Sequence, residues 1–219
     1  MAVGLAGRKV LDLSMPISPS TRVFEGYPTP VIHKWATYSD DGYKANFIFM
    51  VEHTGTHMDA PSHFFEGAPS IDELPPEKFV SRGVCLDFSH KSAREPVSSG
   101  EVEGELERVG ARVGPGWYII FRFDWDKRMG SGEWLRYPYL DSSVARLLAE
   151  KRVEGIGLDS PSPDYSPFEV HKILLPKGIV IIENMSNLES VSGRTFDFIV
   201  VPLKIRGGTA SPVRPLALV

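Results

Sequence analysis

The chain has 219 residues, of which 42% are hydrophobic and 24% charged, so it is long enough to bury a core and is neither a disordered segment nor a coiled coil. Its 28 acidic and 24 basic residues give a net charge of −4, without the clustered Lys and Arg that nucleic acid binding requires. The 20 glycines and 18 prolines exclude a helical bundle, because both residues interrupt helices.

The single cysteine, Cys85, lies in an apolar run and is expected to be a buried thiol, since one cysteine cannot form an intrachain disulfide. A reducing compartment, the cytoplasm, fits this usage. Arg8 and Asp12 interrupt the N-terminal stretch, and no segment reaches the ~20 apolar residues of a membrane span. We therefore expect one cytoplasmic domain over residues 1–219, without a membrane anchor.

Loops and short strands are predicted for the first third, where residues 46–52 form a strand that leads into a histidine-rich segment. Further on, strands are predicted over 84–88, 117–123, 155–159, 179–182 and 196–203, and helices over 100–112 and from the N-cap Asp141 to Arg152. This order predicts an α/β fold with mixed β-sheet layers and flanking helices, and with a more irregular β layer from the first third.

The segment 53–63, HTGTHMDAPSH, contains three of the six histidines and one aspartate. Imidazole nitrogens and a carboxylate oxygen together make a good site for Zn²⁺ or Mn²⁺. The segment differs from the helical H-E-x-x-H motif, because Thr54 replaces the glutamate and because Gly55 and Pro61 disfavour a continuous helix. The ligands are therefore expected to converge through a turn that Gly55 permits.

Extended to Phe64, this segment resembles the signature H-x-G-T-H-x-D-x-P-x-H-F of the metal-dependent cyclase-type hydrolases, a group that includes bacterial kynurenine formamidases and isatin hydrolases. The resemblance continues in chain order through LDLSMPIS (11–18), GIGLDSPSPD (155–164), the segment from His171, IIENMSNL (181–188) and SPVR (211–214). It covers most of the chain.

The resemblance implies a swivelling β/β/α architecture, a homodimer or larger assembly, and two divalent ions. The first ion would be held by His53, His57 and Asp59, and Asp59 would bridge to a second ion held by His171 and Glu183. From the residues alone only the first site can be predicted. His171 and Glu183 are remote from it and, considered singly, could be a loop residue and a strand-end charge.

Two divalent ions lower the pKa of bound water and polarise a carbonyl, so the site suits amide hydrolysis by metal-activated hydroxide. The departing amine needs a proton, and the resemblance implies that His63 is the catalytic proton shuttle. Alternatively, His63 is a third metal ligand or a hydrogen-bond partner of a ligand. The residues do not distinguish zinc from manganese.

The expected substrate is a small-molecule amide, above all an aryl formamide such as N-formylkynurenine, cleaved at its C–N bond. One alternative is ring opening of a cyclic amide, as in isatin hydrolases. Another is a non-catalytic, metal-stabilised binding module whose metal has no open coordination position. His63 favours an enzyme, because a closed structural site needs no proton carrier.

Aromatic side chains are candidates for stacking on a planar substrate. The substrate-binding candidates are Phe64, which follows His63, together with Tyr27 and Trp125, and then Phe24 and Trp134. The chain departs from the family pattern at residues 25–28 and 122–125, where the pocket is expected to differ.

Overall fold

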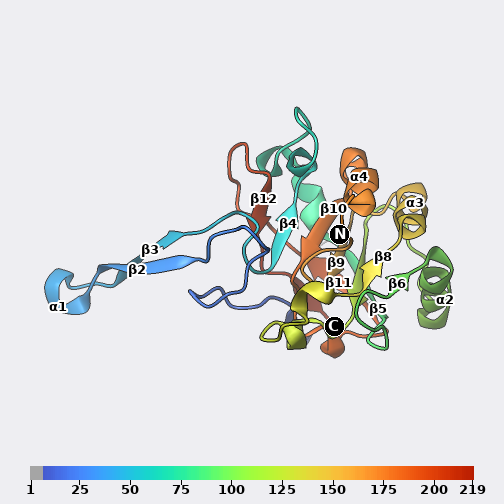
Figure 1. Ribbon diagram of the computed structural model, residues 1–219, viewed down its shortest axis with the longest axis horizontal. Coiled ribbons are helices and arrows are strands. Elements are labelled where there is room, and N and C mark those ends of the chain that lie inside the picture. Colours follow the sequence, from blue (N-terminus) through green and yellow to red (C-terminus); the bar gives the residue numbers. More distant parts are fainter. Residues whose placement is uncertain (1–6) are drawn as a thin grey trace.

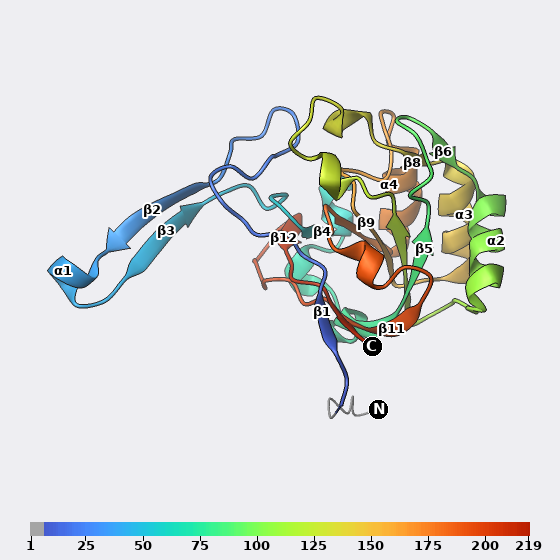
Figure 2. The same cartoon turned by 90° about the horizontal axis from the view of Figure 1, so that it is seen from below.

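Within residues 7–219, nine strands form one mixed sheet that curls through the body of the molecule (Figures 1 and 2). The computed structural model describes residues 7–219. From one edge to the other, the strands are β1 (Val10–Asp12), β13 (Leu216–Leu218), β11 (Thr195–Ile199), β5 (Val80–Asp87), β7 (Trp117–Arg122), β9 (Gly155–Leu158), β10 (Val180–Glu183), β4 (His57–Asp59) and β12 (Ala210–Pro212). β5, β7, β9 and β10 run parallel, and the flanking pairs are antiparallel. The predicted mixed α/β class is confirmed.

The central residues of the parallel strands are apolar because both of their faces are covered. On β7, Ile119 and Phe121 pack into the core beneath the helices, whereas Tyr118 and Ile120 pack into a second core on the opposite face. On β9 there is no space for a side chain at Gly157, because a Cβ atom there would lie 2.5 Å from Met185 Sδ. The glycines of this strand therefore permit the dense packing behind the site.

Helices cover one face of the sheet, where α2 (Ser99–Val109) and α3 (Ser142–Lys151) lie side by side (Figure 2). Both are close to the predicted ranges. Asp141 is the N-cap of α3, as predicted, and accepts hydrogen bonds from the backbone N–H groups of Ser143 and Val144. α4 (Glu169–Leu174) packs against α3. A small parallel pair, β6 (Pro96–Val97) and β8 (Tyr139–Leu140), lies apart from the main sheet.

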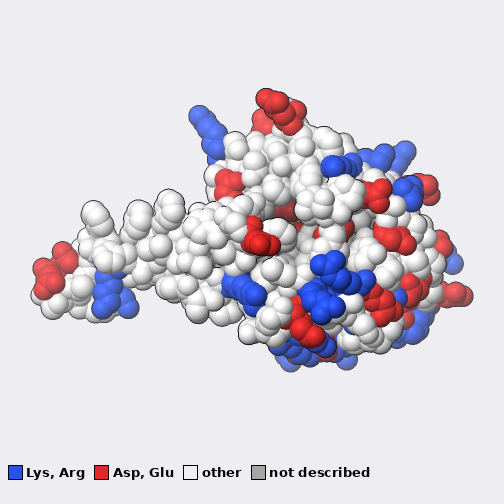
Figure 3. Space-filling model, in the orientation of Figure 1, with Lys and Arg blue, Asp and Glu red and all other residues white. Residues whose placement is uncertain are grey.

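The first third of the chain contributes β1 and β4 to the main sheet and a long hairpin that projects from the body (Figures 1 and 2). This hairpin, residues 31–49, is called the arm. It consists of β2 (Val31–Ala36), the short helix α1 (Tyr38–Asp41) and β3 (Ala45–Phe49). It takes the place of the irregular β layer expected from the sequence. Along the arm the surface is almost free of charge except near the tip (Figure 3).

Two predicted strands are shorter in the structure. The strand expected over 46–52 ends at Phe49, before the turn that leads into the histidine segment, and the strand expected over 196–203 ends at Ile199. Cys85 is buried, as predicted. None of the helices within residues 7–219 is long and apolar enough to cross a membrane.

Candidate metal centre and its cavity

Two adjacent antiparallel strands position three of the predicted ligands. His57 and Asp59 are two residues apart on β4, so their side chains leave the same face of the strand. Glu183 is the last residue of β10 and is the register partner of His57. Strand pairing thus places the carboxylate of Glu183, which is distant in sequence, beside the histidine segment.

The other two ligand candidates come from a turn and a helix. His53 precedes Gly55, whose φ of +65° is a left-handed conformation that glycine adopts without strain. The chain therefore turns between His53 and His57 and does not form a helix, as predicted. His171 lies on α4 and is buried.

These five side chains form two groups that share Asp59. His53, His57 and Asp59 make one group, and Asp59, His171 and Glu183 make the other, with the ligand atoms of each group within 4.8 Å of one another. His57 Nε2 lies 3.4 Å from both Asp59 Oδ1 and Glu183 Oε2. On the other side of the site, His171 Nε2 lies 3.7 Å from Asp59 Oδ2 and 3.5 Å from Glu183 Oε1.

In each of the three candidate ligand histidines, one ring nitrogen contacts another group of the protein and the other nitrogen is directed at the carboxylates. His57 Nδ1 is 2.9 Å from the Gly55 carbonyl, and His171 Nδ1 is 2.7 Å from the carboxylate of Asp164. His53 is held the opposite way, with Nε2 3.2 Å from Thr209 Oγ1 and Nδ1 2.9 Å from Asp59 Oδ1. This is the arrangement of metal-binding histidines, whose second nitrogen fixes the ring and its tautomer.

The residues present fit a divalent cation. His57 Nε2 and Asp59 Oδ1 are buried, and neither makes a hydrogen bond of acceptable geometry with residues 7–219. Buried polar atoms without partners are costly, and a cation would satisfy both of them. Zinc ligands at about 2.0–2.2 Å from the ion lie roughly 3 to 3.6 Å from one another, close to the spacings seen between these side chains.

The site is electrostatically coupled. Burial opposes the charge on Asp59, but the three surrounding imidazoles outweigh it and hold the pKa of this carboxyl well below its usual value. Burial also opposes protonation of His57, yet Asp59 and Glu183 raise its pKa to about 9. The pKa of Glu183 is raised by its burial and by the nearby charge of Asp59. Asp164, Asp59 and Glu183 likewise raise the pKa of His171 against the effect of burial, so without a cation the carboxylates retain protons on His57 and His171.

His63 lies beside the ligands on a single 3-10 turn, Pro61–His63. Its ring centroid is 4.1 Å from that of His53 and 6.4 Å from that of His171. Burial lowers the pKa of His63 to about 4, so the ring is neutral at physiological pH. His63 belongs to neither of the two ligand groups.

These side chains open into a cavity of about 230 Å³ with a largely aromatic lining. Tyr27 stacks on His53 at 6.0 Å, and Phe64 stacks on His171 at 4.7 Å. The residues lining the cavity are Arg22, Val23, Phe24, Tyr27, His53, His57, His63, Phe64, Trp134, Pro161, Ser162, Phe168, His171, Glu183 and Asn184.

Trp125, a predicted substrate-binding residue, is not among the lining residues. It is buried in the core beneath the helices, and its Nε1 donates a hydrogen bond to the Trp134 carbonyl at 2.8 Å. Trp134 lines the cavity in its place. Both tryptophans follow β7, and the sequence does not indicate which of them turns inward.

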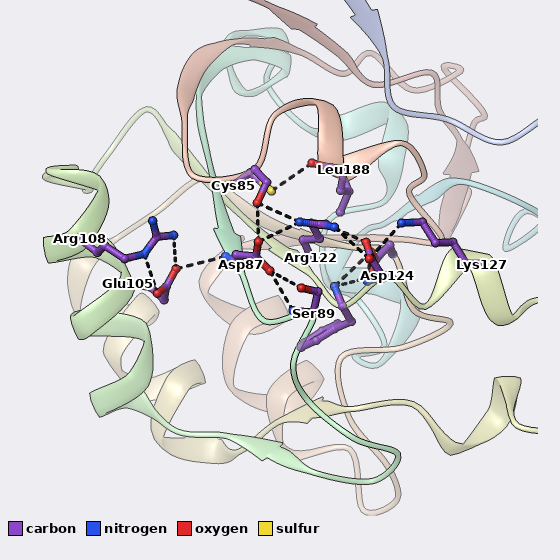
Figure 4. Close-up of polar contacts among 12 residues, drawn as sticks. Cys85, Asp87, Ser89, Glu105, Arg108, Arg122, Asp124, Lys127 and Leu188 are labelled. Atoms are coloured by element: carbon purple, nitrogen blue, oxygen red, sulfur yellow. Dashed lines mark hydrogen bonds and ion pairs between the residues drawn. The ribbon is translucent and has the colours of Figure 1, made fainter.

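Two residues of the departure from the family pattern at 122–125, Arg122 and Asp124, belong to a polar cluster (Figure 4), and neither of them lines the cavity. Arg122 forms a bidentate pair with Asp124 at 2.7 and 2.9 Å, and it contacts Asp87 at 2.8 Å. Lys127 adds a further contact to Asp124 at 3.0 Å. The departure at residues 25–28, in contrast, brings Tyr27 to the cavity.

Several lining or supporting residues were not predicted. Arg22, Phe168 and Asn184 line the cavity, and Asp164 and Thr209 each contact one ring nitrogen of a candidate ligand, His171 and His53 respectively. Asp164 and Asn184 lie inside the segments quoted above for the family resemblance. Their positions in these segments could have indicated that they belong to the site. Arg22 and Thr209 carry no comparable local signal.

Comparison with known proteins places the chain in a family. Residues 11–165 match the family model described as "Putative cyclase", so the chain belongs to this cyclase family. It is 28% identical to isatin hydrolase from Roseibium aggregatum, over 96% of this chain and 92% of that one. It is 31% identical to kynurenine formamidase from Salinibacter ruber, over 94% of this chain and 95% of that one.

A solved structure agrees. Isatin hydrolase A from Labrenzia aggregata, bound to benzyl benzoate, superposes with a TM-score of 0.89 at 28% identity, over 97% of this chain and 94% of that one. Fold, ligand groups and relatives together define the protein as a metal-dependent amidohydrolase.

Proposed function

We propose that this protein hydrolyses the C–N bond of an aryl formamide such as N-formylkynurenine, giving formate and an aromatic amine. The observation that carries the proposal is the position of Asp59, which belongs to two ligand groups beside a cavity lined by aromatic rings. Similarity to kynurenine formamidases supports the choice of substrate.

Two divalent ions, zinc or manganese, would lower the pKa of a coordinated water and polarise the substrate carbonyl. His53, His57 and Asp59 would hold the first ion. Asp59, His171 and Glu183 would hold the second.

His63 would move the proton. Because its pKa is lowered to about 4, it is neutral at pH 7 and can accept a proton at a ring nitrogen. Its position next to His53 and Phe64 places it between the ligands and the aromatic wall. From there it would donate the proton to the nitrogen of the departing amine, which otherwise leaves poorly. Tyr27 and Phe64 would orient the substrate ring.

A substrate panel tests the proposal. Protein reconstituted separately with Zn²⁺ and Mn²⁺ is assayed with N-formylkynurenine and other aryl formamides, and an Asp59→Asn variant serves as the control for contaminating activity. We expect release of formate by the wild type and none by the variant. Absence of turnover for every aryl formamide, with metal bound, would exclude this substrate class.

Ring opening of a cyclic amide is the second candidate, because isatin hydrolases are similar in sequence and in fold. The same nucleophile and proton carrier would serve, but the amine would stay attached to the product. Steady-state assays with isatin and N-formylkynurenine, on one preparation, separate the two reactions through the ratio of their kcat/KM values. A metal-stabilised binding module would turn over neither substrate, and its metal would have no exchangeable water.

We also propose that the protein is a homodimer or larger homo-oligomer in which a second copy covers the arm. The arm exposes Trp35, at 75%, with Phe47, Ile48 and Phe49 all more than half exposed. An isolated two-stranded hairpin is marginally stable in water, and large exposed apolar surfaces mark interfaces. A symmetric pair would bury both arms at once.

The oligomeric state tests this part of the proposal. Light scattering coupled to gel filtration should give a mass of at least two chains for the wild type and a smaller mass for Ile48→Asp. Arg146→Asp, at an exposed position on α3 and outside the arm, is the charge-changing control and should leave the mass unchanged. A wild-type monomer at micromolar concentration would contradict the assembly.

A further inference from the structure

Asn184 presents a side-chain amide to the cavity, and the oxygen of this amide has no hydrogen-bond partner among residues 7–219. It directly follows Glu183 and lines the cavity, although the residue is only 6% exposed. Its Oδ1 is enclosed and makes no hydrogen bond with the described part of the chain. Since the oxygen is enclosed, the end of the amide that meets the cavity is Nδ2, a donor of two hydrogen bonds.

The backbone of Asn184 is fixed by three other segments. Its N–H donates to the Ser160 carbonyl at 3.0 Å. Its carbonyl accepts from Thr56 Oγ1 at 2.6 Å, and that hydroxyl in turn accepts from the Met15 N–H at 3.0 Å. These contacts tie the residue to the loop after β9, to the histidine segment and to the N-terminal strand region. The direction of its side chain is therefore set by the fold.

This backbone is also in an unusual conformation. Asn184 has a φ of +55°, in the left-handed region that residues other than glycine enter at a cost and that asparagine tolerates better than most. Strained conformations of this kind persist where the surrounding structure determines them, and they concentrate at functional sites. A glycine would meet the backbone requirement alone, so the side chain needs its own explanation.

We propose that Asn184 is a catalytic residue whose Nδ2 donates a hydrogen bond to the carbonyl oxygen of the amide substrate and stabilises the negative charge that develops there. This role rests on the proposed hydrolysis. It gives a partner to Nδ2, the end of the amide that meets the cavity, since a group aimed at a ligand is satisfied when the ligand binds. The ligand class is an amide or carboxylate with an aromatic substituent, because aromatic rings line the cavity that the Asn184 amide meets.

The chain offers a matched control for the test. Asn187, three residues further on, has nearly the same φ of +58°, but its side chain is exposed and donates to the Asp12 carbonyl at 3.0 Å. Asn184→Gly and Asn187→Gly therefore make the same change to the same backbone conformation, and only the first removes an amide from the cavity. Asn184→Asp keeps the shape of the side chain and replaces the donor with an acceptor.

The first measurement is binding of benzoate, a stable aromatic carboxylate, to the metal-loaded proteins by calorimetry, with metal content determined for each. We expect Asn184→Gly to bind benzoate at least tenfold more weakly than the wild type, and Asn184→Asp more weakly still because its charge repels the anion. Asn187→Gly should bind within twofold of the wild type. No benzoate binding by the wild type, or equal affinity of the two glycine variants, would overturn the assignment.

The second measurement is turnover of the best amide in the substrate panel. Loss of one donor to a developing oxyanion lowers kcat by about 100- to 1000-fold, so we expect that loss for Asn184→Gly, at unchanged metal content and with a smaller effect on KM. If the wild type hydrolyses no amide but the benzoate pattern holds, the proposed function fails while the oxygen-binding role of Asn184 stands. If the two glycine variants hydrolyse the substrate equally, the role of Asn184 fails and the proposed function stands.

Discussion

Asp164 and His171 form a buried pair in which the carboxylate oxygen Oδ1 lies 2.7 Å from ring nitrogen Nδ1. The other oxygen of Asp164 accepts the Val170 N–H at 2.6 Å, so the carboxylate is fixed on both sides. The pair directs His171 Nε2 towards Asp59 and Glu183. Asp164 thus positions His171, a proposed ligand, without itself belonging to either candidate ligand group.

Replacing Asp164 by Asn should therefore weaken metal binding. The amide keeps the volume but loses the charge that orients the imidazole, and partners of this kind contribute about 10- to 100-fold in metal affinity. Competition titration with a chromophoric chelator measures the change. Asp141→Asn, which preserves the N-cap of α3, is the control and should bind metal as the wild type does. Wild-type affinity in Asp164→Asn would contradict the positioning role.

His63→Ala should abolish most turnover and leave metal content intact. General acid–base catalysis by a positioned side chain contributes about 100- to 10,000-fold, so we expect a loss of kcat in that range. Metal analysis and steady-state kinetics on the same preparation make the comparison, with His90→Ala, an exposed histidine, as the control. Joint loss of metal and activity would identify His63 as a ligand.

The stability of the metal-free protein should depend on pH through His57. Its pKa rises from 6.5 to about 9 in the folded protein because Asp59 and Glu183 outweigh the effect of burial. A raised folded-state pKa gives stability that is fully present below about pH 6.5 and is lost as the pH rises through 9. Thermal unfolding of chelator-treated protein should therefore show Tm falling between these values. In His57→Gln the part of the fall in Tm that is due to His57 should disappear. An unchanged dependence of Tm on pH in this variant would contradict the role of His57.

Gly157→Ala should destabilise the fold, because its Cβ atom would lie 2.5 Å from Met185 Sδ and 2.8 Å from Ile120 Cδ1. Overpacking of a dense core costs about 1–3 kcal/mol in the free energy of unfolding. Gly104→Ala, on α2 where a Cβ would meet nothing within 4 Å, should instead stabilise by about 0.5–1 kcal/mol through helix propensity. Urea denaturation compares the two. Equal stabilities would show that β9 can relax around a methyl group.

The features that the sequence predicts are those formed by residues close to one another in the chain. His53, His57 and Asp59 lie within seven residues of one another, so their convergence needs only the turn at Gly55. The alternating strands and helices follow from apolar runs, and the N-cap at Asp141 follows from its own side chain.

What the residues alone do not predict depends on pairings between distant segments. Glu183 joins the site only because β10 pairs with β4 in a register that sets it opposite His57. His171 reaches it through the packing of α4. For both, the family resemblance supplied the prediction. The arm was not predicted, because the apolar residues of 31–49 resemble those of strands buried in a core.

Metal content and activity, measured on one preparation, test the central claim most directly. Protein purified without chelator should contain close to two divalent ions per chain by elemental analysis. Asp59→Asn should lose both ions together with hydrolytic activity, since Asp59 belongs to both ligand groups. Full activity in metal-free protein, or two ions retained by the variant, would contradict a bridged pair of metal sites.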